Sequence, residues 1–118
     1  MGKSEDLVSA YLKTREPERE AYLWAFSEML RLCEEDPGEA VRVTLDLIEA
    51  CVTEAQLRYV AAGPVEDLLG VSLFPRFAEA CKSSAKVRRA MQLVFVEEAD
   101  AVFPLWKALL LEYGLWNP

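Results

Sequence analysis

The stretch Gly63-Pro64-Val65-Glu66-Asp67-Leu68-Leu69-Gly70 decides the fold, because it combines a helix end, a helix start and two adjacent carboxylates. Glycine is favoured just after the last turn of a helix, and proline is favoured in the first turn. We therefore expect one helix to end at Gly63 and a short one to begin at Pro64. The apolar residues of that short helix must pack inward. They should bring Glu66 and Asp67 toward the interior or a groove.

Similar signals lie on both sides of this stretch. Asp36 followed by Pro37 is typical of a helix N-cap and first position, and Thr53 with Gln56 three residues later forms a capping box. Ser83 or Ser84 should cap a later helix. Between these signals, apolar residues recur at intervals of three and four. We expect helices over residues 4–13, 17–33, 37–52, 54–61 and 64–69, then from Leu73 or Pro75 to Lys82, over residues 85–95, and from Asp100 or Val102 to Tyr113, with boundaries accurate to a few residues.

The expected architecture is all-α. Short loops make sequential helices antiparallel neighbours, so the pattern indicates a compact single-domain bundle of about seven or eight short helices over residues 1–118, or a helical-repeat-like stack. Only Leu93–Val96 competes as a strand, and its helical spacing argues against one. The larger side chains expected to face the core include Trp24, Phe26, Leu30, Val52, Phe77, Phe95 and Trp106.

Length and composition are those of one folded domain. The chain has 118 residues, of which 53% are hydrophobic and 28% charged. Its apolar runs are too short to cross a bilayer and its first residues lack the apolar region of a signal peptide, so we expect no membrane association and a cytoplasmic location. Cys33, Cys51 and Cys81 are odd in number and far apart in the chain, which is typical of core thiols in a reducing compartment.

Several chemistries are excluded by the residue types that are absent. The chain has no histidine, so imidazole bases, Cys-His or Ser-His nucleophile pairs and histidine metal ligands cannot occur. It has no Cys-x-x-Cys motif for a structural zinc site and no glycine-rich phosphate loop. Clusters such as Glu34-Glu35-Asp36 and Glu97-Glu98-Asp100 are interpreted as helix caps and solvated turns. We expect no metal, no cofactor and no catalytic residues, and we favour a non-enzymatic role.

The net charge of −7 is unevenly distributed. Residues 76–96 carry 5 basic and 1 acidic side chains, whereas residues 1–75 carry 7 basic and 15 acidic ones. An acidic surface repels phosphate backbones, so we expect no nucleic-acid binding. The basic stretch of Lys82, Lys86, Arg88 and Arg89 is interpreted as a solvated helix face, with an anionic ligand site as the alternative.

Two sets of residues are candidate site residues. Glu66 and Asp67, in a first helical turn, should meet the positive end of the helix dipole and pair with Arg88 or Arg89, forming a buried ion pair or a binding constellation. Leu115 and Trp116, in the C-terminal tail, either fold back onto the bundle or contact a partner. Folding back is the favoured interpretation.

The order of these features resembles a bacterial family of small domains of unknown function with a Gly-Pro-Leu-Glu-Asp-Leu-Leu signature and a downstream Phe-Arg-x-Ala-Leu. The similarity covers about residues 20–96 and rests on the motifs Trp24-Ala25-Phe26, Asp36-Pro37-Gly38-Glu39-Ala40, Ala62 to Leu69, and Lys86-Val87-Arg88-Arg89-Ala90. Val65, Val87 and Met91 replace the Leu, Phe and Leu that are typical of the family. The resemblance implies an all-helical domain, a bacterial origin, and a recurring constellation of Glu66, Asp67 and Arg88 or Arg89.

Two classes of function follow. In the first, the protein is a small acidic protein-binding module, such as an immunity or antitoxin-like inhibitor, whose negative surface meets a basic partner protein. In the second, a groove near Glu66, Asp67 and Arg88 is a small-molecule or catalytic site. The absence of histidine and of any nucleophile constellation favours the first class.

Overall fold

The computed structural model describes residues 3–15, 17 and 19–117. Its helices are α1 (Lys3–Lys13), α2 (Leu23–Glu35), α3 (Pro37–Ala50), α4 (Glu54–Val60), α5 (Glu66–Leu68), α6 (Phe74–Cys81), α7 (Ala85–Leu93) and α8 (Phe103–Glu112). A short 3₁₀ turn over Arg19–Tyr22 precedes α2. No strand occurs in the described ranges. The predicted all-α bundle of about seven or eight short helices is confirmed.

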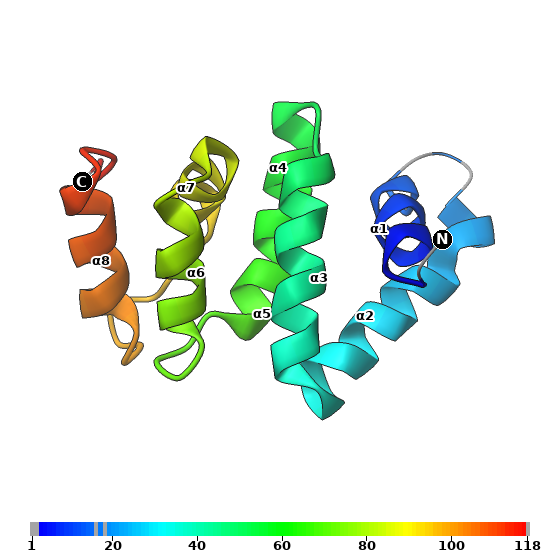
Figure 1. Ribbon diagram of the computed structural model, residues 1–118, viewed down its shortest axis with the longest axis horizontal. Helices are drawn as coiled ribbons and strands as arrows, with labels where there is room; N and C mark the ends of the chain where they lie inside the picture. The colour runs from blue at the N-terminus through cyan, green and yellow to red at the C-terminus, as the bar shows by residue number, and fades with distance from the viewer. Residues whose placement is uncertain (1–2, 16, 18, 118) are drawn as a thin grey trace.

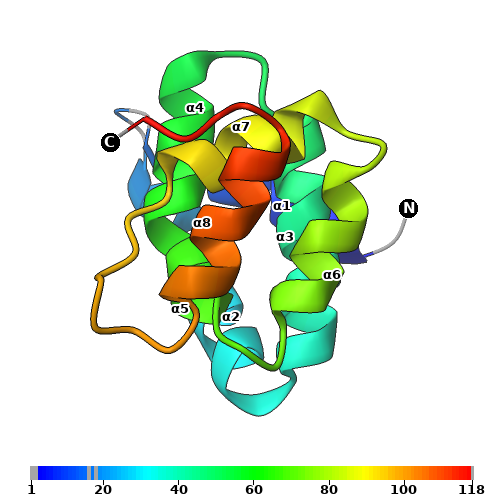
Figure 2. The same cartoon turned by 90° about the vertical axis from the view of Figure 1, so that its left-hand side faces the viewer.

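The helices form an elongated stack along an axis of 40 Å, with the other two extents at 29 and 26 Å. Figure 1 shows α3 and α4 in the middle, α1 and α2 at one end, and α8 at the other. The central helix α3 contacts α1, α2, α4, α6 and α7. Figure 2, seen from the α8 end, shows α8 beside α6 and α7. Terminal helices of such a stack have neighbours on one side only.

One continuous apolar core runs through the stack. Leu47 and Ile48 of α3 are fully buried at its centre, together with Phe77 of α6 and Met91 of α7. Thr44 is also fully buried, and its hydroxyl donates to the Ala40 carbonyl at 2.7 Å, which satisfies the polar atom within its own helix. The predictions for Phe77 and Trp106 are confirmed, since both are buried.

The predicted helix starts at the interhelix turns are confirmed by their hydrogen bonds. The Asp36 carboxylate accepts from the Glu39 amide at 3.3 Å, with Pro37 in the first helical position. Thr53 and Gln56 form the expected reciprocal capping box at the start of α4. The Ser84 hydroxyl accepts from the Val87 amide at 3.1 Å and begins α7. Each bond satisfies a donor that a helix N-terminus leaves unpaired.

The chain around Gly63 follows the prediction. Gly63 has non-helical backbone angles, with φ of −102° and ψ of −105°, and it separates the helical turn that ends α4 from the one that continues into α5. Pro64 has no amide hydrogen, so it is favoured in the first turn of the second segment. The two helical segments therefore meet at a kink at Gly63.

Five predicted core residues are exposed instead, namely Trp24, Phe26, Leu30, Val52 and Phe95. The first three lie on α2, which sits at one end of the stack and has no neighbour over part of its apolar surface. The other two follow the last residues of α3 and α7, so the helical periodicity no longer sets their direction. The second helix also begins at Leu23 rather than at Pro17.

None of the helices in the described part of the chain is both long and apolar enough to span a bilayer.

Candidate functional site

The predicted ion-pair residues do not come together. Arg88 of α7 donates from Nη1 to the Cys81 carbonyl at 2.6 Å, and its guanidinium lies 5.3 Å from the centre of the Tyr113 ring. Arg89 donates from Nε to Glu54 Oε1 at 2.9 Å, and from Nη1 to the Gln92 side chain. Arg88 thus contacts the end of α6 and the chain after α8, whereas Arg89 contacts α4 and a neighbour on α7.

Glu66 and Asp67 are exposed, and within the described residues neither carboxylate forms an ion pair with Arg88 or Arg89. The prediction of a buried ion pair is wrong. Its physical reason is helix geometry, since successive residues on a helix point about 100° apart. Glu66 and Asp67 consequently face different hollows of the surface. A ligand-binding role for these residues stays a prediction.

Glu66 faces a hollow of about 300 Å³ that is shared with the loop after α7. Glu97 and Asp100 line it as well, together with Phe95. Across the described ranges, no three acidic or cysteine side chains gather closely enough to hold a metal ion. The Glu66 hollow is therefore a solvated acidic surface, and we assign no ligand to it.

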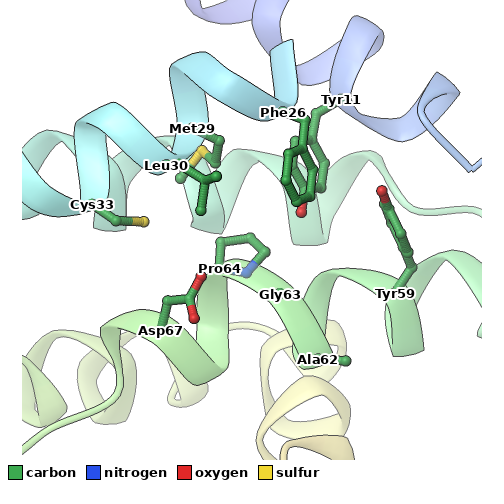
Figure 3. A pocket seen from close by; sticks show the side chains of 10 residues that line it. All are labelled: Tyr11, Phe26, Met29, Leu30, Cys33, Tyr59, Ala62, Gly63, Pro64 and Asp67. Atoms are coloured by element: carbon green, nitrogen blue, oxygen red, sulfur yellow. The ribbon is translucent and has the colours of Figure 1, made fainter. Parts of the chain in front are cut away.

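Asp67 faces a second, mostly apolar hollow, called the Asp67 pocket below. Its volume is about 280 Å³. Figure 3 shows α2 on one side of the pocket and the Gly63–Asp67 segment on the other. The lining residues are Tyr11, Phe26, Met29, Leu30, Cys33, Tyr59, Ala62, Gly63, Pro64 and Asp67. Among these described lining residues, Asp67 alone carries a charge at neutral pH.

Tyr11 forms the inner wall of the Asp67 pocket. Its ring stacks on Phe26 with the centroids 6.1 Å apart and lies 5.5 Å from the ring of Tyr59. The Tyr59 hydroxyl is paired with the hydroxyl of Thr14 at 2.5 Å. The Tyr11 hydroxyl, by contrast, has no hydrogen-bond partner in the described part of the chain, although the residue is only 2% exposed. The hydroxyl therefore opens into the pocket, since no fully buried side-chain oxygen of the described residues lacks a hydrogen-bond partner.

Gly63 permits this position of Tyr11. A Cβ atom at residue 63 would lie 2.7 Å from the Tyr11 hydroxyl oxygen, which is closer than two such atoms can approach. The Gly-Pro pair thus has two structural roles. Glycine admits the tyrosine to the pocket wall, and proline begins the helical segment that carries Asp67 to the pocket mouth.

The electrostatics of the pocket are set by burial and by Asp67. Burial, with smaller contributions from the charges of Asp67 and Glu34, raises the pKa of the Cys33 thiol to about 11. The pKa of Tyr11 is also raised, first by burial, then by Tyr59 and Asp67. Both groups are therefore neutral at pH 7, and the pocket carries one negative charge at its edge.

The reactivity of Cys33 should follow from this arrangement. Only the thiolate is alkylated, so a pKa of about 11 should make the reaction with iodoacetamide slow at pH 8, rising about tenfold per pH unit below the pKa. Asp67→Asn removes a charge that disfavours the thiolate and should increase the rate about two- to fivefold. Mass spectrometry of the tryptic peptide that contains Cys33 measures the rate.

Glu66→Gln is the matched control for that experiment, because it removes the same charge from the neighbouring residue that faces the other hollow. Its alkylation rate should equal that of the wild type. Equal rates in wild type and Asp67→Asn would show that Asp67 does not face Cys33.

The C-terminal tail folds back onto the bundle, as the favoured interpretation predicted. Gly114 adopts a left-handed conformation with φ of 69°, and the Leu115 amide donates to the Leu110 carbonyl at 2.7 Å, which ends α8. Trp116 is half-buried and packs edge-on against Trp106 at 5.7 Å. A partner contact through Leu115 and Trp116 stays a prediction.

Sequence reasoning found the Gly63–Gly70 segment and Asp67, but it missed most of the pocket. Tyr11, Cys33 and Tyr59 come from three different helices and are brought together only by the packing of α1, α2 and α4. The exposed positions Phe26 and Leu30 were predicted to be core residues. The one available signal was the excess apolar width of the α2 pattern, which exceeds what a single neighbouring helix can cover.

These observations define a small all-helical domain with an apolar, acid-edged pocket between α2 and the Gly-Pro turn. A family model described as "Family of unknown function (DUF6869)" matches residues 13–107, and the chain belongs to this family. The match includes the Gly63–Gly70 stretch and, except for Tyr11, the residues that line the Asp67 pocket. No curated protein and no solved structure matches the chain.

Proposed function

We propose that this protein is a small acidic protein-binding module that binds a basic partner protein through α2, in the manner of an immunity or antitoxin-like inhibitor. A bacterial, cytoplasmic setting belongs to the same proposal and agrees with three unpaired cysteines in the described structure. The observation that carries the proposal is an exposed apolar stripe along α2, which continues into the Asp67 pocket.

The stripe consists of Leu23, Phe26, Leu30 and Cys33, called the α2 stripe below. Their spacing of three, four and three residues puts them on one face of the helix. Leu23, Phe26 and Leu30 are 47%, 40% and 44% exposed. Scattered apolar residues are common on surfaces, but a continuous stripe bordering an apolar pocket is typical of an interaction site.

The charge of the chain supports a basic partner. The net charge is −7, and negative surfaces accelerate the encounter with positive ones. Basic side chains near the pocket are largely engaged within the protein itself. Arg31 of α2, for example, pairs with Glu28 and Glu35 on the same helix. The α2 stripe is thus an apolar surface that adjoins a pocket with the Asp67 carboxylate at its edge.

The basic island offers little to an anionic ligand. Lys82 pairs with Glu79 at 2.9 Å, and Lys86 donates to the carbonyls of Glu49 and Cys51 at 2.8 Å each. Arg88 and Arg89 have the partners described above. Because these four cations already stabilise helix ends and neighbouring carboxylates, their arrangement supports the expectation that the protein does not bind nucleic acid.

The alternative function, a small-molecule or catalytic site near Glu66, Asp67 and Arg88, has weaker support. Glu66 and Asp67 face separate hollows, and Arg88 lines neither of these two. Neither of these two hollows combines the three side chains. Of the two hollows, the Asp67 pocket has the more apolar lining, which suits a binding function of either kind.

A substitution in the α2 stripe tests the proposal. Leu30→Glu places a charge in the centre of the stripe and should abolish binding of a partner from an extract of the native host, with little effect on folding because the position is exposed. The measurement is affinity capture at low ionic strength, followed by identification of the retained protein. That protein should be basic and should be released as the salt concentration rises.

Leu111→Glu is the matched control, since Leu111 is an exposed leucine on α8 at the other end of the stack. It should retain the partner at the wild-type level. Equal retention by Leu30→Glu and the wild type, or capture that is insensitive to salt, would contradict the proposal. Recovery of the protein without any partner at low salt would also contradict the proposal.

A further inference from the structure

We propose that the Asp67 pocket receives one cationic side chain, a lysine or an arginine, from the partner protein. The aliphatic part of that side chain would lie along Phe26, Leu30 and Pro64, and its charged end would meet Asp67. This inference rests on the proposed function and names the feature of the partner that the pocket recognises.

The size of the pocket fits a side chain. Its volume of about 280 Å³ is at or below the lower limit for sites that bind drug-sized ligands or cofactors. The walls supplied by α2 and the Gly-Pro turn are apolar, which suits the methylene groups of a long basic residue. The pocket also opens beside the α2 stripe, so a partner lying on that helix would have the pocket within reach of one side chain.

Two polar groups select the charge of the occupant. Asp67 carries the negative charge, and the Tyr11 hydroxyl offers an oxygen that accepts no hydrogen bond in the described structure. An ammonium or guanidinium group can donate to both oxygens. A carboxylate or phosphate would instead face Asp67 and be repelled. A neutral apolar side chain would leave the Tyr11 hydroxyl without a partner.

Cys33 makes the preference measurable without knowing the partner, because its thiol lines the same pocket. In thiol–disulfide exchange, the Cys33 thiolate attacks one sulfur of a small symmetric disulfide and forms a mixed disulfide. The other sulfur leaves as a thiolate and takes up a proton. The group attached to Cys33 is 2-aminoethyl from cystamine, 2-hydroxyethyl from bis(2-hydroxyethyl) disulfide, and 2-carboxyethyl from 3,3′-dithiodipropionate.

The three probes differ in charge but are similar in size. Each adduct is brought to equilibrium with added 2-mercaptoethanol, and the concentration that reduces half of it is measured. That concentration should be about three- to tenfold higher for the cystamine adduct of Cys33 than for the hydroxyethyl adduct, and it should be lowest for the carboxyethyl adduct. Peptide mass spectrometry assigns each adduct to Cys33 rather than to the buried Cys51 or Cys81.

Asp67→Asn should remove the advantage of cystamine, whereas Glu66→Gln should retain it although it changes the net charge equally. Equal stability of the three adducts in the wild type would overturn the inference. The same order in wild type and Asp67→Asn would also overturn it, because the preference would then reflect the acidity of the whole chain.

The partner provides the second arm of the test. Asp67→Asn should weaken its retention about three- to tenfold, with Glu66→Gln at the wild-type level. If Leu30→Glu abolishes retention while Asp67→Asn has no effect, the proposed function stands and this inference falls. If cystamine is preferred but no partner is ever retained, a free small amine would replace the partner's side chain as the occupant, and both proposals would fall.

Discussion

Phe77→Ala should lower the free energy of unfolding by about 3–5 kcal/mol. Phe77 is fully buried in α6 and is among the largest side chains in the core. Its removal takes apolar atoms out of contact and leaves a cavity, because α6 is held against α7, α3 and α8 and cannot collapse fully into the space. Urea denaturation followed by circular dichroism measures the change.

Phe95→Ala is the matched control, since Phe95 has the same side chain and was also predicted to face the core. It is 67% exposed. Its replacement should change the free energy of unfolding by about 0.5 kcal/mol or less. A large loss at Phe95, or a small one at Phe77, would show that the helices pack with different faces inward.

Gly63→Ala should lower the free energy of unfolding by about 1–3 kcal/mol, the usual range for forcing an extra atom into a packed site. The new methyl group would collide with the hydroxyl of Tyr11, and the ring of Tyr11 cannot easily move because it is stacked on Phe26. Tyr11→Phe removes the colliding oxygen. Because that hydroxyl has no hydrogen-bond partner in the described residues, its loss alone should cost little.

The double variant gives the sharper result. Tyr11→Phe combined with Gly63→Ala should recover part of the stability lost in Gly63→Ala, as a double-mutant cycle in denaturant would show. Gly70→Ala controls for the general effect of replacing glycine, since a Cβ there would meet nothing within 4 Å. A cycle with no coupling between residues 11 and 63 would contradict the geometry of the pocket wall.

Local signals in the chain predicted much of the fold. Asp36-Pro37, Thr53 with Gln56, Ser84 and Gly114 all mark helix ends where the structure has them. These signals work because they satisfy the backbone groups of one helix end and depend on neighbours within a few residues. The all-helical class follows from them and from the apolar spacing.

Properties that depend on the relative positions of helices were harder to predict. The apolar pattern of α2 does not reveal that the helix lies at the end of the stack, so Phe26 and Leu30 were wrongly placed in the core. Likewise, the adjacency of Glu66 and Asp67 suggested one shared partner, whereas the helix turn directs them to different hollows. The predicted partners of these carboxylates bind elsewhere. Arg88 donates to the Cys81 carbonyl at the end of α6, and Arg89 donates to Glu54.

The features of the Asp67 pocket connect the Gly63–Gly70 stretch to the proposed binding function. Gly63 admits Tyr11, Pro64 begins the helical segment after the kink, and Asp67 supplies the charge, so three residues of one short stretch line the same hollow. The residues next to them, Leu68 and Leu69, are buried and hold the segment against the core. The structural signal and the proposed recognition surface thus occupy the same turn.

Hydrogen–deuterium exchange of the protein with and without its captured partner tests the proposed binding surface most directly. Binding through the α2 stripe and the Asp67 pocket should slow exchange in residues 23–35 and 59–68 and leave residues 103–112 unchanged. Protection confined to α6, α7 and α8, with α2 unaffected, would contradict it.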